Sequence, residues 1–210
     1  MSVTTLIAAV RRRTGLSSSD AFAADADITE LLNEVSSAVA TEHDWPWLET
    51  SSTALVTANG TAAYAVPADW MRTRTLQIAG SAPMDSSRSR EQLDGYWPTS
   101  TVGDGEPRFF VISGDQIRLY PTPGGVYTVT HVYYRRETVL DDGADEPLMP
   151  SWAQGILIWG AAAELLRRTG QDARADEAQQ QYDRWLRRLE DNKRRTVGPA
   201  RVRVRPGGFV

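Results

Sequence analysis

Residues 108–137 read RFFVISGDQIRLYPTPGGVYTVTHVYYRRE, and this stretch decides the fold class. Aromatic and β-branched residues fill three short runs in it, at 108–113, 116–120 and 126–137. Such residues favour strands, and glycine or proline separates one run from the next, which favours turns. The stretch therefore predicts three consecutive antiparallel strands, a β-meander.

A second β-rich stretch lies upstream and is centred on Asn59-Gly60. Tight hairpin turns prefer the pair Asn-Gly, because both residues adopt positive φ readily. We therefore expect a hairpin with arms at about 50–57 and 61–66, ended by Pro67 since proline cannot donate to a strand ladder. Another strand is expected at about 72–79.

The stretch 81–105 is polar and is interrupted by two prolines and three glycines. Segments of this composition run over the surface and vary more than the elements they connect. We expect an exposed excursion from the β domain that contains one short helix, at about 89–93.

Helices are expected on both sides of the β-rich middle, since apolar residues recur there every three or four positions. Their expected bounds are about 3–13, 28–43, 150–169 and 172–194. Asp27 is placed to cap the second helix, with Glu30 three residues on as its capping-box partner. Gly15 and Gly170 follow the first and third helices as C-terminal caps. Pro150 suits the first turn of the third helix.

These elements predict an α+β fold, in which a small antiparallel β domain is flanked by N-terminal helices and a C-terminal helical hairpin, with an extended C-terminal arm. We expect residues 1–196 to form a single domain and residues 197–210 to form the arm. Of the 210 residues 41% are hydrophobic, enough for a core, and none is cysteine, which fits synthesis in a reducing cytoplasm. No run approaches the ~20 apolar residues of a membrane helix, so no membrane partner is expected.

Residues 184–210 differ in charge from the rest of the chain. They contain nine Lys or Arg and two acidic residues, a net charge of +7, which leaves −11 for residues 1–183 because the whole chain carries −4. Valine and arginine alternate over 201–205 as in a strand, with no partner strand nearby in sequence. The arm can therefore extend along another chain, and its charge predicts an acidic partner, either protein or nucleic acid. A solvated tail is the plain alternative.

The sequence contains no motif of catalysis, of cofactor binding or of metal binding. His43 and His131 are the only histidines, and no spacing of metal ligands joins them, so we interpret both as structural or exposed residues. Neither a nucleophile elbow nor a phosphate-binding loop occurs. The acidic stretch 141–146 lacks the alternating ligands of a calcium loop and is interpreted as a solvated linker. We therefore expect no enzyme, no cofactor and no metal.

Aromatic and basic residues of two predicted strands could form a stacking platform for single-stranded nucleic acid. They are Phe109, Phe110, Tyr133, Tyr134, Arg135 and Arg136. Neighbouring strand residues point to opposite faces, so one ring of each aromatic pair must face the core. We therefore favour a structural role for these rings.

Five short signatures follow one another along the chain. They are WLET at 47–50, YAVPAD at 64–69, EPRFF at 106–110, IRLYPTP at 117–123 and LMPSW at 148–152. In their order, and in the arrangement of helices around a small β domain, the chain resembles the head-to-tail adaptor proteins of tailed bacteriophages, also called connector or head completion proteins. The resemblance covers about residues 25–195.

This resemblance implies a structural virion protein of the head-tail neck, made in the host cytoplasm. Similar proteins form a homo-oligomer ring, typically twelvefold, under the portal protein, and extend the channel through which DNA passes without specific binding. A stopper or tail protein would bind the opposite side, and the stretch 81–105 would face a neighbouring subunit or that tail-side ring. The C-terminal arm would dock onto the portal. The expected docking residues are Arg194, Arg195, Arg201, Val202, Arg203, Val204, Arg205 and Phe209.

Other classes of function remain open at this point. The strongly basic arm departs from the family pattern, and it could make the chain a nucleic-acid-binding module. Another structural protein of the virion neck or tail is a further alternative, and an enzyme would need a site that the sequence does not reveal.

Overall fold

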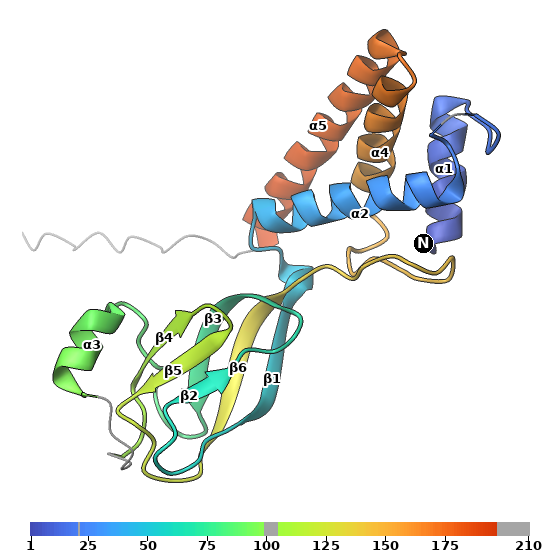
Figure 1. The fold of residues 1–210 in the computed structure, drawn as a ribbon. Helices are drawn as coiled ribbons and strands as arrows, with labels where there is room; N and C mark the ends of the chain where they lie inside the picture. Colours follow the sequence, from blue (N-terminus) through green and yellow to red (C-terminus); the bar gives the residue numbers. More distant parts are fainter. Residues whose placement is uncertain (21, 99–104, 197–210) are drawn as a thin grey trace, which may run out of the picture. The chain divides into compact units, whose positions relative to one another are not determined.

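The computed structural model describes residues 1–20, 22–98 and 105–196 (Figure 1). The chain divides into two compact units. One, here called the helical unit, combines residues 1–47 with the chain from residue 137 onward, and the other, the β unit, spans residues 48–136. Helices and two small antiparallel sheets together confirm the α+β fold class.

The helical unit is built around α4, against which α1, α2 and α5 pack (Figure 1). The bounds of these helices are Val3–Thr14 for α1, Asp25–Glu42 for α2, Gly155–Arg168 for α4 and Asp172–Thr196 for α5. Small residues let the helices approach closely, since a Cβ added at Gly155 would lie 2.5 Å from the Trp185 ring and one at Gly160 would lie 2.7 Å from Val35. The two C-terminal helices form the predicted helical hairpin.

The two glycine caps are confirmed. Gly15 adopts a left-handed conformation with φ 69°, and its N–H donates to the Arg11 carbonyl at 2.8 Å. Helix α4 ends at Arg168, and Gly170 follows its C-cap residue Thr169. Gly170 has φ 72°, and its N–H donates to the Arg167 carbonyl. Positive φ at these positions explains why glycine occupies them.

The predicted start of the second helix is wrong by three residues. Helix α2 begins at Asp25, and its N-cap residue is Ala24, so Asp27 lies inside the first turn and forms no capping box with Glu30. Contacts with α1 fix the earlier start, because Arg11 reaches the Asp25 carboxylate at 2.6 Å and the Ala23 carbonyl at 2.7 Å. A tertiary ion pair therefore outweighs the local capping signal.

The prediction that Pro150 opens the third helix is also wrong. Residues 151–154 form turns, and α4 begins only at Gly155. The buried Gln154 side chain holds this turn, since its amide donates to the Met149 carbonyl at 2.8 Å and its carbonyl accepts from the Met1 ammonium at 3.0 Å. Met1 is 153 residues away in the sequence, so its contact is invisible to a local pattern.

The β unit contains two three-stranded antiparallel sheets. In the first, the order is β1 (Glu49–Val56), β6 (Thr128–Arg135), β3 (Trp70–Ile78). In the second, the order is β2 (Ala63–Ala65), β5 (Gln116–Tyr120), β4 (Phe109–Ser113). Their apolar faces share one core, formed by Leu76, Ile78, Met84, Phe110, Ile117, Leu119 and Val129. The short helix expected in the excursion is α3 (Arg90–Tyr96), which begins with a capping box between Ser89 and Gln92.

The predicted hairpin around Asn59-Gly60 is wrong, although the turn exists. Strand β1 pairs with β6, whereas β2 pairs with β5, so the turn carries the chain from one sheet to the other. Hydrogen bonds across the turn explain this, because the Tyr64 hydroxyl accepts from Ala58 at 2.9 Å and donates to Thr61 at 2.7 Å. The Gly60 N–H donates to Pro123 of a distant loop instead of closing a hairpin.

The predicted meander is confirmed in its first half only. Strands β4 and β5 form an antiparallel hairpin through Gly114, which has φ 59°. Strand β6 does not continue that sheet but lies between β1 and β3. Pro121 and Pro123 explain the break, since they follow β5 directly and neither has an N–H for a ladder.

A short 3-10 helix, Pro46–Leu48, lies where the chain passes from one unit to the other. It carries Trp47, one of the signature residues.

Candidate interaction surfaces

The residues expected to dock the arm fall mostly beyond what the structure describes. Arg194 and Arg195 lie in the last turn of α5. The others, Arg201, Val202, Arg203, Val204, Arg205 and Phe209, lie outside the described residues. The structure does describe α5 as far as Thr196, the residue before the predicted arm.

The last turns of α5 are held against the C-terminal end of α2. His43 Nε2 lies 3.1 Å from the Glu190 carboxylate, and the Lys193 ammonium lies 5.7 Å above the Trp45 ring. Trp45 is fully buried and donates from its indole to the Val39 carbonyl at 2.6 Å. These contacts attach α5 near Glu190 and Lys193 to the end of α2, and His43 has the structural role that the sequence favoured.

An apolar groove opens beside this helix end, and we call it the aromatic groove. It has a volume of about 300 Å³ and is lined by Pro46, Trp47, Pro150, Trp152, Leu189, Asn192 and Lys193. Trp47 stacks on buried Trp45, with ring centroids 4.7 Å apart and planes at 14°, while Trp152 is 50% exposed. The fold thus brings together the first and last of the five signatures, WLET and LMPSW. Sequence reasoning did not anticipate the groove, although a proline one or two residues before each tryptophan was its visible sign.

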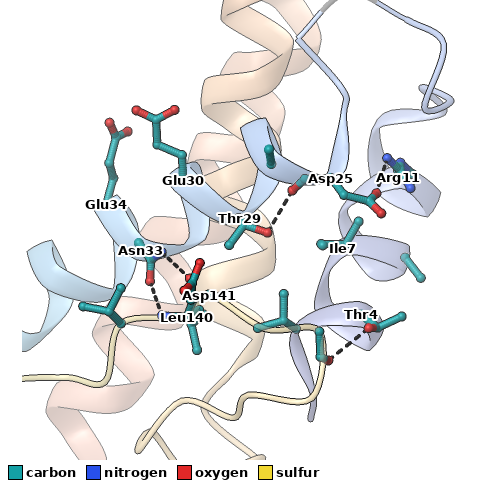
Figure 2. Close-up of a pocket in the computed structure, with 15 residues that line it drawn as sticks. Thr4, Ile7, Arg11, Asp25, Thr29, Glu30, Asn33, Glu34, Leu140 and Asp141 are labelled. Atoms are coloured by element: carbon teal, nitrogen blue, oxygen red, sulfur yellow. Dashed lines mark hydrogen bonds and ion pairs between the residues drawn. The ribbon is translucent and has the colours of Figure 1, made fainter.

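A larger cleft, of about 760 Å³, lies between α1, α2 and the loop at 139–143 (Figure 2). Asn33 fixes the loop, because its amide donates to the Leu140 carbonyl and its carbonyl accepts from the Leu140 N–H, both at 2.8 Å. Thr4 Oγ1 donates to the Gly143 carbonyl at 3.0 Å from the other side. The cleft is thus a preformed feature of the helical unit.

Carboxylates outnumber cations around this cleft. Its ionisable side chains are Arg11, Asp25, Glu30, Glu34 and Asp141. Arg11 is paired with Asp25 at 2.6 Å, and Glu34 reaches Arg168 at 3.6 Å, while Figure 2 shows Glu30 and Glu34 side by side on α2. The local charge matches the acidic character predicted for the body of the chain.

The acidic loop at 141–146 uses a carboxylate to stabilise its own backbone. Asp145 accepts from the N–H groups of Asp141 and Asp142 at 2.9 and 2.8 Å, and these bonds lower the pKa of its carboxyl. Glu146 lies 3.6 Å from the Met1 ammonium. Among the described residues no three His, Cys, Asp or Glu side chains gather as a metal site would require.

In the β unit, α3 is attached to the second sheet by a tyrosine. The Tyr120 hydroxyl donates to the Asp94 carboxylate at 2.6 Å, which lowers the pKa of Asp94. Burial is the main cause that raises the pKa of Tyr120 to about 12, and this hydrogen bond is the second. Arg88 lies 5.8 Å from the Tyr96 ring centroid and 4.9 Å from that of Phe109, while Tyr96 is 68% exposed. The excursion therefore presents an aromatic and basic surface.

His131 is buried in the first sheet. Its Nε2 lies 2.9 Å from Thr73 Oγ1, which also accepts from the Trp70 indole at 2.9 Å. Burial lowers the pKa of His131 to about 4, so the ring is neutral near pH 7. It packs on Tyr133, with ring centroids 4.8 Å apart. These contacts make His131 a structural residue, as expected.

The aromatic pairs follow the strand alternation that the sequence predicted. Phe110 and Tyr133 are each 5% exposed and face the core, while Phe109 and Tyr134 are half-buried on the other faces. The Tyr133 hydroxyl donates to Asp69 at 2.8 Å. Burial mainly, and this hydrogen bond secondarily, raise the pKa of Tyr133 to about 12. Two of the four rings are thus unavailable for stacking on bases.

A comparison with protein families identifies the class of molecule that carries these surfaces. The sequence matches the SU10 adaptor protein family over residues 1–205. The chain therefore belongs to this family of phage head-tail adaptors, which confirms the resemblance found in its signatures. It is a phage structural adaptor that interacts with other phage head or tail proteins.

Two further findings complete the comparison. No curated protein matches the chain significantly. Among the described helices, none combines the length and the apolar character needed to cross a membrane.

Proposed function

We propose that this protein forms a ring beneath the portal, joins the phage head to the tail and extends the DNA channel. The observation that carries the proposal is membership of the adaptor family over almost the whole chain. Twelvefold symmetry is the stoichiometry that the resemblance implies. On this proposal the protein acts mechanically, in the virion neck, and catalyses no reaction.

The C-terminal arm is proposed to dock onto the portal. The contrast in charge along the chain supports this proposal. Residues 184–210 carry a net charge of +7, and residues 1–183 carry −11, since the whole chain carries −4. The arginines of the arm would bind polar groups of the portal, and Val202, Val204 and Phe209 would fill apolar pockets on it. Repeated around a ring, weak contacts of this kind gain from effective concentration.

The excursion that carries α3 is proposed to contact a neighbouring subunit or the tail-side ring. The exposed Tyr96 and the Arg88 side chain beside it supply the kind of surface that interfaces favour. The stopper or tail protein would bind on that side.

Binding to purified portal rings of the parent phage tests the docking of the arm. The chain 1–196 is expected to fold like the full-length protein but to bind the portal at least about tenfold more weakly, which corresponds to about 1.4 kcal/mol. A triple variant R201Q/R203Q/R205Q separates the polar contribution from the apolar one. Equal portal binding by the full-length and truncated chains would remove the arm from the docking mechanism.

A nucleic-acid-binding role for the arm is the second candidate, and its high positive charge is the observation that favours it. If three arginines neutralise DNA phosphates, the logarithm of DNA affinity falls with the logarithm of salt concentration with a slope of about −2.7. A flat dependence, or no binding, excludes DNA as the main partner.

A further inference from the structure

We propose that the aromatic groove holds the first residues of the arm, 197–200, of the same chain, before the arm meets its partner. The proposal assumes only that these residues belong to the arm. It does not depend on the portal as the partner, so it goes beyond the function proposed above.

The position of the groove favours the arm as its occupant. Leu189, Asn192 and Lys193 line the groove, and α5 ends at Thr196. Lys193 and Thr196 are thus one turn apart, roughly 5 Å along the helix axis. Pro199 follows three residues later, and three extended residues span roughly 10 Å. The chain therefore leaves α5 beside the groove, within reach of it.

The chemistry of the groove matches residues 197–200, which are Val, Gly, Pro and Ala. Proline-containing extended segments dock on grooves lined by aromatic rings, because their backbone loses little entropy on binding. Here the rings are Trp47 and Trp152, flanked by Pro46 and Pro150, with buried Leu189 among the lining residues. The half-exposed Trp152 would lose contact with water when Pro199 packs against it.

The charge of the aromatic groove determines which part of the arm can enter it. Lys193 lines the groove and carries a positive charge, so an arginine placed there would meet a like charge. Residues 197–200 are uncharged, and the first arginine of the arm is Arg201. The groove would therefore hold the uncharged start of the arm and leave Arg201, Arg203 and Arg205 outside it, available to a partner.

Attachment within one chain is favoured over exchange between chains. A segment tethered next to its site experiences an effective concentration in the millimolar range, well above that of a second copy in dilute solution. Fixing the start of the arm also sets the direction in which the arginines leave the helical unit. Fewer residues are then ordered when the arm docks, which lowers the entropic cost of docking.

Fluorine NMR of the full-length protein labelled with 5-fluorotryptophan tests the proposal, with the Trp152 signal assigned through W152F. The Trp152 signal of the full-length protein is expected to be shifted, and protected from solvent, relative to that of the chain 1–196. The P199R variant is expected to lose this shift, because it removes the proline and places a positive charge beside Lys193. Trp70, in the β unit, serves as an internal reference whose signal should stay constant.

The matched control is P206R, which introduces the same charge at the other proline of the arm. It should retain the Trp152 shift. The same Trp152 signal in full-length and truncated chains would overturn the proposal, and equal effects of P199R and P206R would overturn its assignment to residues 197–200. A shift that disappears on dilution would make a second copy the occupant, which also contradicts it. None of these readouts involves the portal, so failure of portal binding would leave the result intact.

Discussion

His131 links the stability of the β unit to pH. Its pKa is about 4 in the folded protein, lowered by burial from an ordinary value of 6.5, and its Nδ1 has no hydrogen-bond partner among the described residues. The unfolded chain therefore takes up this proton at higher pH than the folded chain does. The free energy of unfolding should fall as pH falls from about 6.5 to 4, by at most about 3 kcal/mol from this group.

The H131Q variant isolates this contribution, because glutamine keeps a polar group near Thr73 and does not titrate. We expect the free energy of unfolding of the wild-type protein to fall more than that of H131Q between about pH 7 and pH 5. Denaturant titrations at both pH values measure the difference. Parallel losses in the two proteins would show that His131 does not couple folding to protons.

Gly155 is required by close packing in the helical unit. A Cβ at this position would lie 2.5 Å from the Trp185 ring, closer than van der Waals contact allows. We expect G155A to lower the free energy of unfolding by about 1–3 kcal/mol, since overpacking forces the helices apart. Thermal or denaturant unfolding measures the change.

Gly95 in α3 offers a matched control, because a Cβ there has no neighbour within 4 Å. G95A should leave stability unchanged or raise it by up to about 1 kcal/mol, through helix propensity. Destabilisation of similar size by G155A and G95A would contradict the packing explanation.

At the scale of elements, a hydrogen bond attaches α3 to β5. The Tyr120 hydroxyl donates to Asp94 at 2.6 Å. We expect Y120F to speed amide hydrogen exchange in α3 and to lower stability by about 1 kcal/mol. The variant Y133F removes a comparable bond, to Asp69, in the other sheet. Exchange in α3 should be normal in Y133F, and equal acceleration by both variants would refute a local attachment.

The elements that the sequence predicts well are those decided by local chemistry. Gly15 and Gly170 mark helix ends because a left-handed residue is needed there, and Ser89 with Gln92 caps α3. The predicted bounds of helices are wrong where groups distant in the sequence determine where a helix begins. Arg11 sets the start of α2, and Gln154 delays α4 through its bonds to Met1 and Met149. Arg11 lies on another helix and Met1 lies 153 residues from Gln154, so neither enters a periodicity argument about the helix that it affects.

The same distinction explains the strands and the interaction surfaces. The positions of the strands follow from composition, but their partners do not, since β6 pairs with β1 and β3 across long sequence separations. The aromatic groove likewise unites Trp47 with Trp152, which only the folded helical unit brings together. The predicted arm residues could be named from charge and alternation, because both are properties of the sequence itself.

At the scale of the whole molecule, the β unit is inserted between two segments of the helical unit. This division could not be predicted from composition, because residues 137 onward complete a unit that residues 1–47 begin. We nevertheless propose that residues 1–196 unfold as the single domain that the sequence predicts. Unfolding of the β unit alone would leave a long loop between packed helices. Coincident transitions by circular dichroism and by tryptophan fluorescence are expected, and two separate transitions would contradict the proposal.

We propose that the protein is the adaptor between portal and tail. Immunogold electron microscopy of purified virions of the parent phage, with antibodies against this chain, tests that claim most directly. We expect gold label at the single neck between head and tail. Label elsewhere on the particle, or none at accessible necks, would contradict it.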